Sequence, residues 1–157
     1  MKTEIFLGLG SNLNDPIKQI QSGLKALGYL LDKLECANWY RSKPLGPQNQ
    51  PDFVNTVVKG LSSLSPQEFL KECQRIENEH QRVKTEHWGP RTLDIDILYF
   101  GQVRVSTEEL TIPHPEILQR PFVVIPLMDL MPSGITPVGD QIDRTRYDLY
   151  SLPRIDQ

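Results

Sequence analysis

The sequence predicts a single α+β domain built on an antiparallel β-sheet with two helices on one of its faces. The chain has 157 residues, which is the length of one domain. Segments with strand-like and helix-like patterns follow one another in the order β, α, β, β, α, β. The composition, with 38% hydrophobic and 24% charged residues, is typical of a soluble globular domain with a proper core. We therefore expect residues 1–157 to form one domain.

The chain begins with a strand and a helix. An apolar run at 5–9 is bounded by glycine, serine and asparagine residues, which is typical of a buried strand that enters a turn. Asp15 can cap a helix whose first position is Pro16, and apolar residues then follow at spacings of three and four. This pattern predicts an amphipathic helix over about 16–31.

Two more strands and a second helix follow. Segments 34–41 and 53–61 are rich in aromatic and β-branched residues, which favours strands. The sequence SKPLGPQNQPD between them is expected to form a surface loop, because proline lacks a backbone donor and restricts its neighbour. Ser65 and Glu68 have the spacing of a capping box, which predicts a helix over 66–80.

The rest of the chain predicts a strand, a hairpin and a third helix. The sequence TLDIDILYF alternates apolar and polar residues in its first half, and Gly101 then suggests a hairpin to Val103 and Val105. A third helix is expected near 121–131, followed by an ordered or semi-ordered arm. With two helices on one face of the sheet, this order is the ferredoxin-like arrangement.

Charge and cysteine content restrict the possible partners and compartment. Lys and Arg total 17 against 20 Asp and Glu, which disfavours binding to polyanions through overall charge. Cys36, Cys73 and the three histidines show no zinc-ligand spacing, so a reduced, cytoplasmic protein is the simplest interpretation. The apolar stretch 122–128 is far shorter than the roughly 20 residues that span a bilayer, and the N-terminus lacks the pattern of a signal peptide.

Two acidic residues form the first candidate site. In a strand, Asp94 and Asp96 would project from one face, while Leu93, Ile95 and Ile97 project from the other. Like charges this close repel unless a cation lies between them, and Mg²⁺ is a hard ion that binds carboxylate and phosphate oxygens. An exposed sheet face on which the acids contact water explains the pair equally well.

Basic residues gather just before this pair. They are Arg82, Lys84, His87 and Arg91, with Trp88 among them. Positive groups beside a metal site suit a triphosphate. The alternative is a solvated loop that is positive by chance.

Further candidates lie elsewhere in the chain. His114 stands between two prolines and Arg120 follows it, so both could neutralise phosphate oxygens, although a structural histidine is an alternative. Phe53 and Asn55 share one face of a strand, a combination that can stack on and hydrogen-bond to a flat heterocycle. Phe122 is the candidate for a second stacking ring, and ordinary core packing explains Phe53 as well.

The segments WGPRTLDIDILYFG, RVKTEHW, PLGPQNQPDFVN, IPHPEILQRPF and GLGSNL closely resemble the 6-hydroxymethyl-7,8-dihydropterin pyrophosphokinase family of folate biosynthesis. The resemblance covers roughly residues 5–130 in the family's order. It implies a ferredoxin-like fold and transfer of pyrophosphate from ATP to the hydroxymethyl group of the pterin, with release of AMP.

The resemblance also implies roles for individual residues. Asp94 and Asp96 would hold two Mg²⁺ ions that bridge the ATP phosphates. The positions expected to contact ATP are Gln74, Glu77, Arg82, Lys84, Trp88, Arg91, Ile97, Thr111, His114 and Arg120. Those expected to contact the pterin are Ser42, Lys43, Leu45, Phe53, Asn55, Trp88, Asp94 and Phe122. Arg82, Lys84 and Arg91, on or near a loop that closes over the phosphates, would join the two aspartates as the catalytic group.

Three positions depart from the family pattern. Many relatives have arginine where this chain has Lys84 and His87, and tyrosine where it has Phe53. Lysine offers a point charge in place of a planar fork, and His87 would be only partly charged near neutrality. We expect weaker charge neutralisation there and a mild effect of the missing tyrosine hydroxyl.

Two other functions stay open on the sequence. Sheets of this type with exposed aromatics also bind single-stranded RNA, although paired aspartates on the sheet would repel a phosphate backbone. A non-catalytic relative that only binds partners is the second alternative. The expected partners are two small molecules, ATP and the pterin, with no nucleic acid and no membrane, and the expected state is a monomer.

Overall fold

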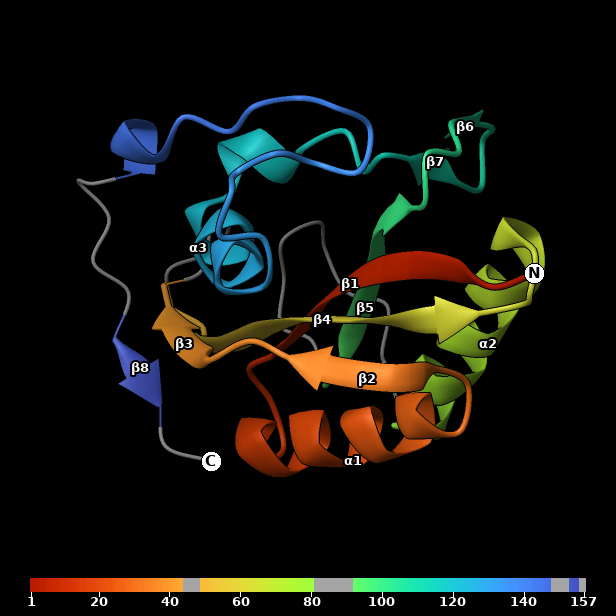
Figure 1. Ribbon diagram of the computed structural model, residues 1–157. Helices are drawn as coiled ribbons and strands as arrows, with labels where there is room; N and C mark the ends of the chain where they lie inside the picture. Colours follow the sequence, from red (N-terminus) through yellow and green to blue (C-terminus); the bar gives the residue numbers. More distant parts are fainter. Residues whose placement is uncertain (44–48, 81–91, 148–152, 156–157) are drawn as a thin grey trace.

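The fold is an antiparallel sheet with helices on both faces (Figure 1). The structure is a computed structural model that describes residues 1–43, 49–80, 92–147 and 153–155. Within these ranges the strands of the main sheet are β1 (Thr3–Ser11), β2 (Asp32–Cys36), β3 (Trp39–Ser42), β4 (Phe53–Ser62), β5 (Asp94–Phe100) and β8 (Arg154–Ile155). Their order is β5-β1-β4-β3-β8, and β2 also pairs with β4. All of these pairs are antiparallel.

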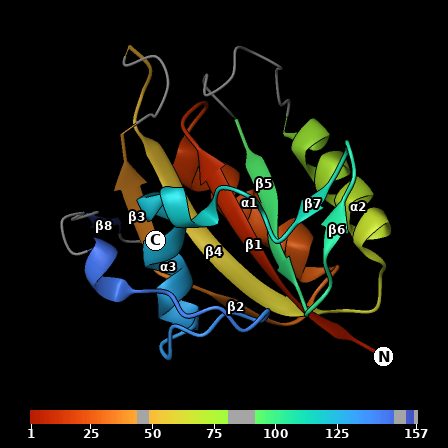
Figure 2. The ribbon, with the colours of Figure 1, turned by 90° about the horizontal axis from the view of Figure 1, so that it is seen from above.

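Three α-helices lie in the described part of the chain. They are α1 (Pro16–Gly28), α2 (Pro66–Glu79) and α3 (Pro121–Leu130). Helices α1 and α2 cover one face of the sheet, as predicted, and α3 lies on the opposite face (Figure 1). Seen from above, α3 lies by β3 and β4, and α2 lies near β5 (Figure 2).

The sheet separates two hydrophobic cores. The α1/α2 core contains Ile20, Leu27, Phe69, Ile76 and the strand residues Ile5, Leu7, Leu9, Ile95 and Ile97. The α3 core contains Phe6, Val57, Leu98, Tyr99, Val123, Val124 and Leu127. Alternation along each strand sends successive side chains to opposite cores. The α3 side of the sheet is therefore the side that Asp94, Asp96 and Asn55 share.

Strand β1 is longer than predicted. It continues through Gly8 and Gly10 to Ser11, so the expectation that the strand gives way to a turn at Gly10 and Ser11 was wrong. Both glycines pair with a neighbour on each side: Gly8 with Val57 of β4 and Asp96 of β5. Backbone hydrogen bonds to two strands hold the chain extended where the local sequence favours a turn.

Helix α1 is shorter than predicted and is capped differently. It ends at Gly28, because the chain must reverse before β2 begins at Asp32, although Leu31 is still buried. Asp15 occupies the N-cap position with φ 64° and makes no side-chain capping hydrogen bond, so the predicted cap was wrong. Its carboxylate instead lies 3.8 Å from the amine of Lys18.

The predicted strand over 34–41 is divided into β2 and β3. The break falls at Ala37 and Asn38, and the carboxylate of Asp129 on α3 accepts the backbone N–H of Asn38 at 3.2 Å. By contrast, α2 agrees with the prediction: the Ser65 hydroxyl accepts from the Glu68 N–H, and the Glu68 carboxylate accepts from the Ser65 N–H. The capping box is therefore confirmed.

The predicted hairpin is placed differently. Gly101, with φ 54°, turns the chain out of the main sheet, and β6 (Val105–Ser106) pairs with β7 (Thr111–Ile112) in a separate two-stranded sheet. The expectation of a hairpin with β5 was wrong. Short 3₁₀ turns then follow at Ile117–Gln119 and Arg144–Tyr147.

The predicted arm after α3 returns to the main sheet. Its last described residues form β8, which pairs with the outer edge of β3. Of the helices within the described ranges, none has the length and apolar character that crossing a membrane demands.

Candidate functional site

The two aspartates lie on one face of β5, as predicted. Ile95 and Ile97 pack into the α1/α2 core, so Asp94 and Asp96 project on the α3 side, where both are half-buried. In the ranges that the structure describes, no three His, Cys, Asp or Glu side chains gather into a metal-ligand set. A divalent ion here would therefore need oxygens from a substrate or from water in addition to the two carboxylates, as Mg²⁺ commonly does.

Glu77 fixes the strand that carries the aspartates. Its carboxylate Oε2 accepts the backbone N–H of Ile95 at 2.8 Å, and the residue is only 7% exposed. This hydrogen bond ties α2 to the peptide bond between Asp94 and Ile95, a role that the sequence did not reveal. Gln74, one turn earlier on α2, is exposed. The contacts of both residues with ATP stay predictions.

Arg120 lies beside the aspartate pair. Its Nη1 is 3.6 Å from Oδ2 of Asp96, and its Nη2 is 3.3 Å from Oε2 of Glu116. The side chain is 12% exposed and extends from the residue that precedes α3. The structure thus brings the predicted cation and one predicted metal ligand together from distant parts of the sequence.

His114 is held in one orientation near the same acids. Its backbone N–H donates to the Leu98 carbonyl at 3.0 Å, and its ring Nδ1 accepts the N–H of Glu116 at 3.2 Å. The neutral ring therefore carries its proton on Nε2. Burial lowers the pKa of His114, and the positive charge of Arg120 lowers it further, against the opposing effects of Glu116 and Asp94.

Asn55 and Ser42 form a buried polar pair on the other side of the site. The Asn55 amide Nδ2 donates to the Ser42 hydroxyl at 2.6 Å, and the two residues are 5% and 8% exposed. This bond fixes the amide orientation and directs Oδ1 toward β1. Phe53, two residues earlier on β4, is half-buried.

Gly10 forms the floor between these two groups. It pairs with Asp94 on one side and with Asn55 on the other, so the two functional strands are about 10 Å apart across β1. A Cβ at Gly10 would lie 3.1 Å from the Asn55 Oδ1 and 3.8 Å from the Phe53 Cδ1. The sequence reasoning missed this role, although a glycine inside a strand can signal close approach of another group.

Four more of the predicted residues lie on other elements of the fold. Phe122 lies half-buried in the first turn of α3 and packs against the α3 core. Lys43 is exposed just beyond β3, and Thr111 is exposed in β7. The Ile97 side chain is buried in the α1/α2 core. Their contacts with substrates stay predictions.

Several predictions lie outside the described residues. They concern Leu45, Arg82, Lys84, His87, Trp88 and Arg91.

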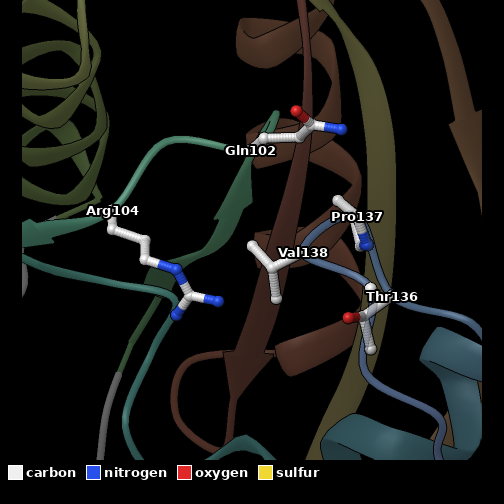
Figure 3. Close-up of a pocket in the computed structure, with 6 residues that line it drawn as sticks. Gln102, Arg104, Thr136, Pro137 and Val138 are labelled. Carbon is white, nitrogen blue, oxygen red and sulfur yellow. The ribbon is translucent and has the colours of Figure 1, made fainter.

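A separate pocket lies at the opposite end of β5 from Asp94. It has a volume of about 450 Å³ and is lined by Gln102, Arg104, Thr136, Pro137, Val138 and Gly139. Gln102 and Arg104 come from the connection between β5 and β6, and the other lining residues come from the arm (Figure 3). The predicted site residues do not line it.

Comparisons with known proteins bear on the family of the chain. The model of the family described as 7,8-dihydro-6-hydroxymethylpterin-pyrophosphokinase (HPPK) matches residues 6–132. A relative from Haemophilus influenzae, named 2-amino-4-hydroxy-6-hydroxymethyldihydropteridine pyrophosphokinase, is 46% identical over 134 residues, which is 84% of each chain. The Pseudomonas aeruginosa protein of that name is 42% identical over 141 residues, or 88% of this chain and 87% of the relative.

Solved structures show the same fold. Wild-type HPPK-DHPS from Plasmodium falciparum matches 96% of this chain with a TM-score of 0.72 at 14% identity. This chain spans only 45% of that longer one, and at such low identity the likeness concerns the fold alone. The family match and the two bacterial relatives carry the assignment: the chain belongs to the 7,8-dihydro-6-hydroxymethylpterin-pyrophosphokinase family.

Proposed function

We propose that this protein transfers pyrophosphate from ATP to 6-hydroxymethyl-7,8-dihydropterin in folate biosynthesis, giving the pterin diphosphate and AMP. The observation that carries the proposal is the strand register around Gly10. It places Asp94, which would hold a metal, and Asn55, which would bind the pterin, opposite each other across one strand without a side chain between them. Two substrates bound on this floor would have their reacting groups near each other.

The phosphate side of the site combines two carboxylates, one guanidinium and one neutral imidazole. Asp94 and Asp96 would hold two Mg²⁺ ions, and bound Mg²⁺ neutralises phosphate oxygens and aligns the transferred group. Arg120, already beside Asp96, would offer its guanidinium to the same phosphates. His114, neutral through its lowered pKa, would donate a hydrogen bond from Nε2 without adding charge.

The pterin side would hold a flat, polar ring. Ser42 keeps the Asn55 amide fixed, so Oδ1 can accept an N–H of the pterin, and Phe53 would supply a stacking face. Phe122 on α3 would supply the opposite face. This orientation would place the hydroxymethyl group toward Asp94.

The chemical step needs no covalent enzyme intermediate. The hydroxymethyl oxygen would form a bond with the β-phosphorus of ATP as the bond from that phosphorus to the bridging oxygen of the α-phosphate breaks. AMP leaves with the bridging oxygen, and the hydroxyl proton passes to solvent. Cys73 is unsuited to act as a nucleophile, because burial raises the pKa of its thiol well above the usual range. Positioning and charge neutralisation would therefore account for the rate.

The test of this proposal is pterin-dependent formation of AMP from ATP and Mg²⁺. We expect AMP only when both the pterin and Mg²⁺ are present, and Asp94→Asn or Asp96→Asn should reduce its formation by about a hundredfold or more. Asp143→Asn makes the same change of charge in the arm, at a carboxylate whose hydrogen bonds are to Thr145, and should leave the rate unchanged. If wild-type protein forms no AMP that depends on the pterin, the proposal fails.

We also propose a ferredoxin-like topology, a reduced cytoplasmic setting and a monomeric state, as the sequence suggested. The order β5-β1-β4, continued by β2 and β3 on the far side of β4, supports the ferredoxin-like arrangement. Cys36 and Cys73 are both free thiols, which supports a reduced, cytoplasmic setting. A site assembled from one chain supports a monomer.

A further inference from the structure

Ser11 and Asn12 are two buried polar residues whose side chains donate hydrogen bonds to the segments just before β5 and β4. They end β1 and begin the turn before α1. Their exposed fractions are 0% and 1%, which is unusual for residues of these types unless their hydrogen bonds are satisfied. Neither residue belongs to the groups proposed to touch ATP, Mg²⁺ or the pterin.

Asn12 holds the segment that leads into β4. Its amide Nδ2 donates to the Gln50 side-chain oxygen at 2.9 Å and to the Pro51 carbonyl at 2.8 Å. Pro51 lies two residues before Phe53, the first residue of β4. The bonds of Asn12 therefore fix the chain just before the residues proposed to bind the pterin.

Ser11 holds the segment that leads into β5. Its hydroxyl donates to the carbonyl of Thr92, which is itself buried. Thr92 lies two residues before Asp94, the first residue of β5. The bond of Ser11 therefore fixes the chain just before the residues proposed to hold the metal.

We propose that Ser11 and Asn12 are positioning residues that set the distance between the aspartate pair and the pterin-binding residues. The last ladder pairs that β1 makes at this end of the sheet are Ser11 with Val54 and Gly10 with Asp94, so the pairing of β1 with both neighbouring strands ends beside the functional residues. Strand ends open easily, and a displacement of about 1 Å at a reacting group can cost about a hundredfold in rate. The inference rests on the proposed function, because that function defines the two sets of ligands.

This arrangement predicts separable effects for the two residues. Asn12→Ala or Asn12→Asp should weaken binding of the hydroxymethyl pterin about tenfold or more, measured by calorimetry with saturating Mg²⁺ and a non-hydrolysable ATP analogue. Binding of the Mg²⁺-analogue complex to the same variants should change less than about twofold. Ser11→Ala should show the reverse, with weaker binding of the Mg²⁺-analogue complex and a smaller effect on the pterin.

The two Asn12 variants test the hydrogen bonds themselves. Asn12→Asp keeps the shape of the side chain but replaces the amide donor by an oxygen that faces two acceptors, so its effect should equal or exceed that of Asn12→Ala. Wild-type pterin affinity in a folded Asn12→Asp protein would contradict the inference.

A matched control separates positioning from general loss of stability. Asn38→Ala removes an asparagine side-chain bond, at 3.1 Å to Asp129, away from the aspartate pair. This variant should unfold at a lower temperature and bind both ligands normally. The positioning role is wrong if Ser11→Ala and Asn12→Ala instead weaken the binding of both ligands by one common factor, or leave the binding of both unchanged.

The wild-type titration distinguishes the two possible failures. Wild-type protein that binds neither ligand would contradict the proposed function. Wild-type protein that binds both ligands, combined with variants that do not discriminate between them, would contradict only the role of Ser11 and Asn12.

Discussion

Gly10 contributes to the site because it has no side chain. Any Cβ at this position would lie 3.1 Å from the Asn55 Oδ1, closer than an ordinary van der Waals contact. The amide cannot move away freely, because Ser42 holds its Nδ2. The glycine therefore keeps the floor open between the phosphate side and the pterin side.

Gly10→Ala is expected to weaken pterin binding about tenfold, since the new methyl group would displace Asn55 or occupy the floor. The measurement is the dissociation constant of the pterin in the presence of a saturating ATP analogue. Gly28→Ala is the matched control, because a Cβ there meets no atom within 4 Å. Unchanged pterin affinity in Gly10→Ala would show that the ring does not lie on this floor.

His114 should make the folded state less stable at acidic pH. Its folded pKa lies below the ordinary value of 6.5, first because the ring is buried and then because Arg120 is close. The unfolded chain therefore binds the proton more readily, and stability falls as the pH decreases from 6.5 through the folded pKa.

The check is urea unfolding between about pH 5 and pH 7.5, compared with His114→Gln. The glutamine variant should lose less stability over this range, because it has no proton to bind. Equal slopes for the two proteins would indicate that His114 titrates normally in the folded state.

Helix α3 is joined to the sheet by one carboxylate near its C-terminal end. Asp129 accepts the hydroxyl of Tyr40 at 2.7 Å as well as the backbone N–H and side-chain amide of Asn38. Burial raises the pKa of Tyr40, and the bond to Asp129 raises it further, so the phenol remains a donor. The helix that presents Phe122 and follows Arg120 is thereby connected to β3.

Asp129→Ala is expected to lower the free energy of unfolding by about 1–3 kcal/mol, because three donors lose their acceptor. Tyr40→Phe removes one donor and should cost about 1 kcal/mol. Chemical denaturation measures both changes, and Glu108→Ala on the exposed β6–β7 connection is the control. A negligible change in Asp129→Ala would mean that water replaces the carboxylate without loss.

The elements differ in how far the local sequence could predict them. The start of α2 was predictable because Ser65, Pro66 and Glu68 mark it within four consecutive residues. The break between β2 and β3 was not, because one of the groups that holds it, Asp129, lies 91 residues away from Asn38 in the sequence. The capping box is a local signal that marked the start of α2, whereas this strand break depends on the helix that packs against it.

At the scale of the whole molecule, the last described residues of the chain form a strand of the main sheet. Strand β8 pairs with the outer edge of β3, Arg41 donates to the Pro153 carbonyl at 2.9 Å, and Ile155 packs against the α1/α2 core. An uncovered edge strand offers unpaired backbone groups to other chains. The arm therefore both stabilises the sheet and covers one of its edges.

Truncation after residue 152 should lower the free energy of unfolding by about 1–3 kcal/mol, through lost backbone bonds and apolar contact. It should also increase self-association, which light scattering would detect. Ile155→Ala keeps the backbone pairing and should cost stability without promoting association. A truncated protein that is fully stable and monodisperse would contradict this role of the arm.

The sequence by itself determined the positions of most helices and strands and the common face of Asp94 and Asp96. These features follow from the period of two along a strand and from helix start signals, which act over a few residues. Only the tertiary structure decided which strands are neighbours, and so it alone placed Gly10 between Asp94 and Asn55, Arg120 beside Asp96, and Glu77 against Ile95. Pairing between distant segments depends on the packing of both cores at once, and no local pattern of residues encodes it.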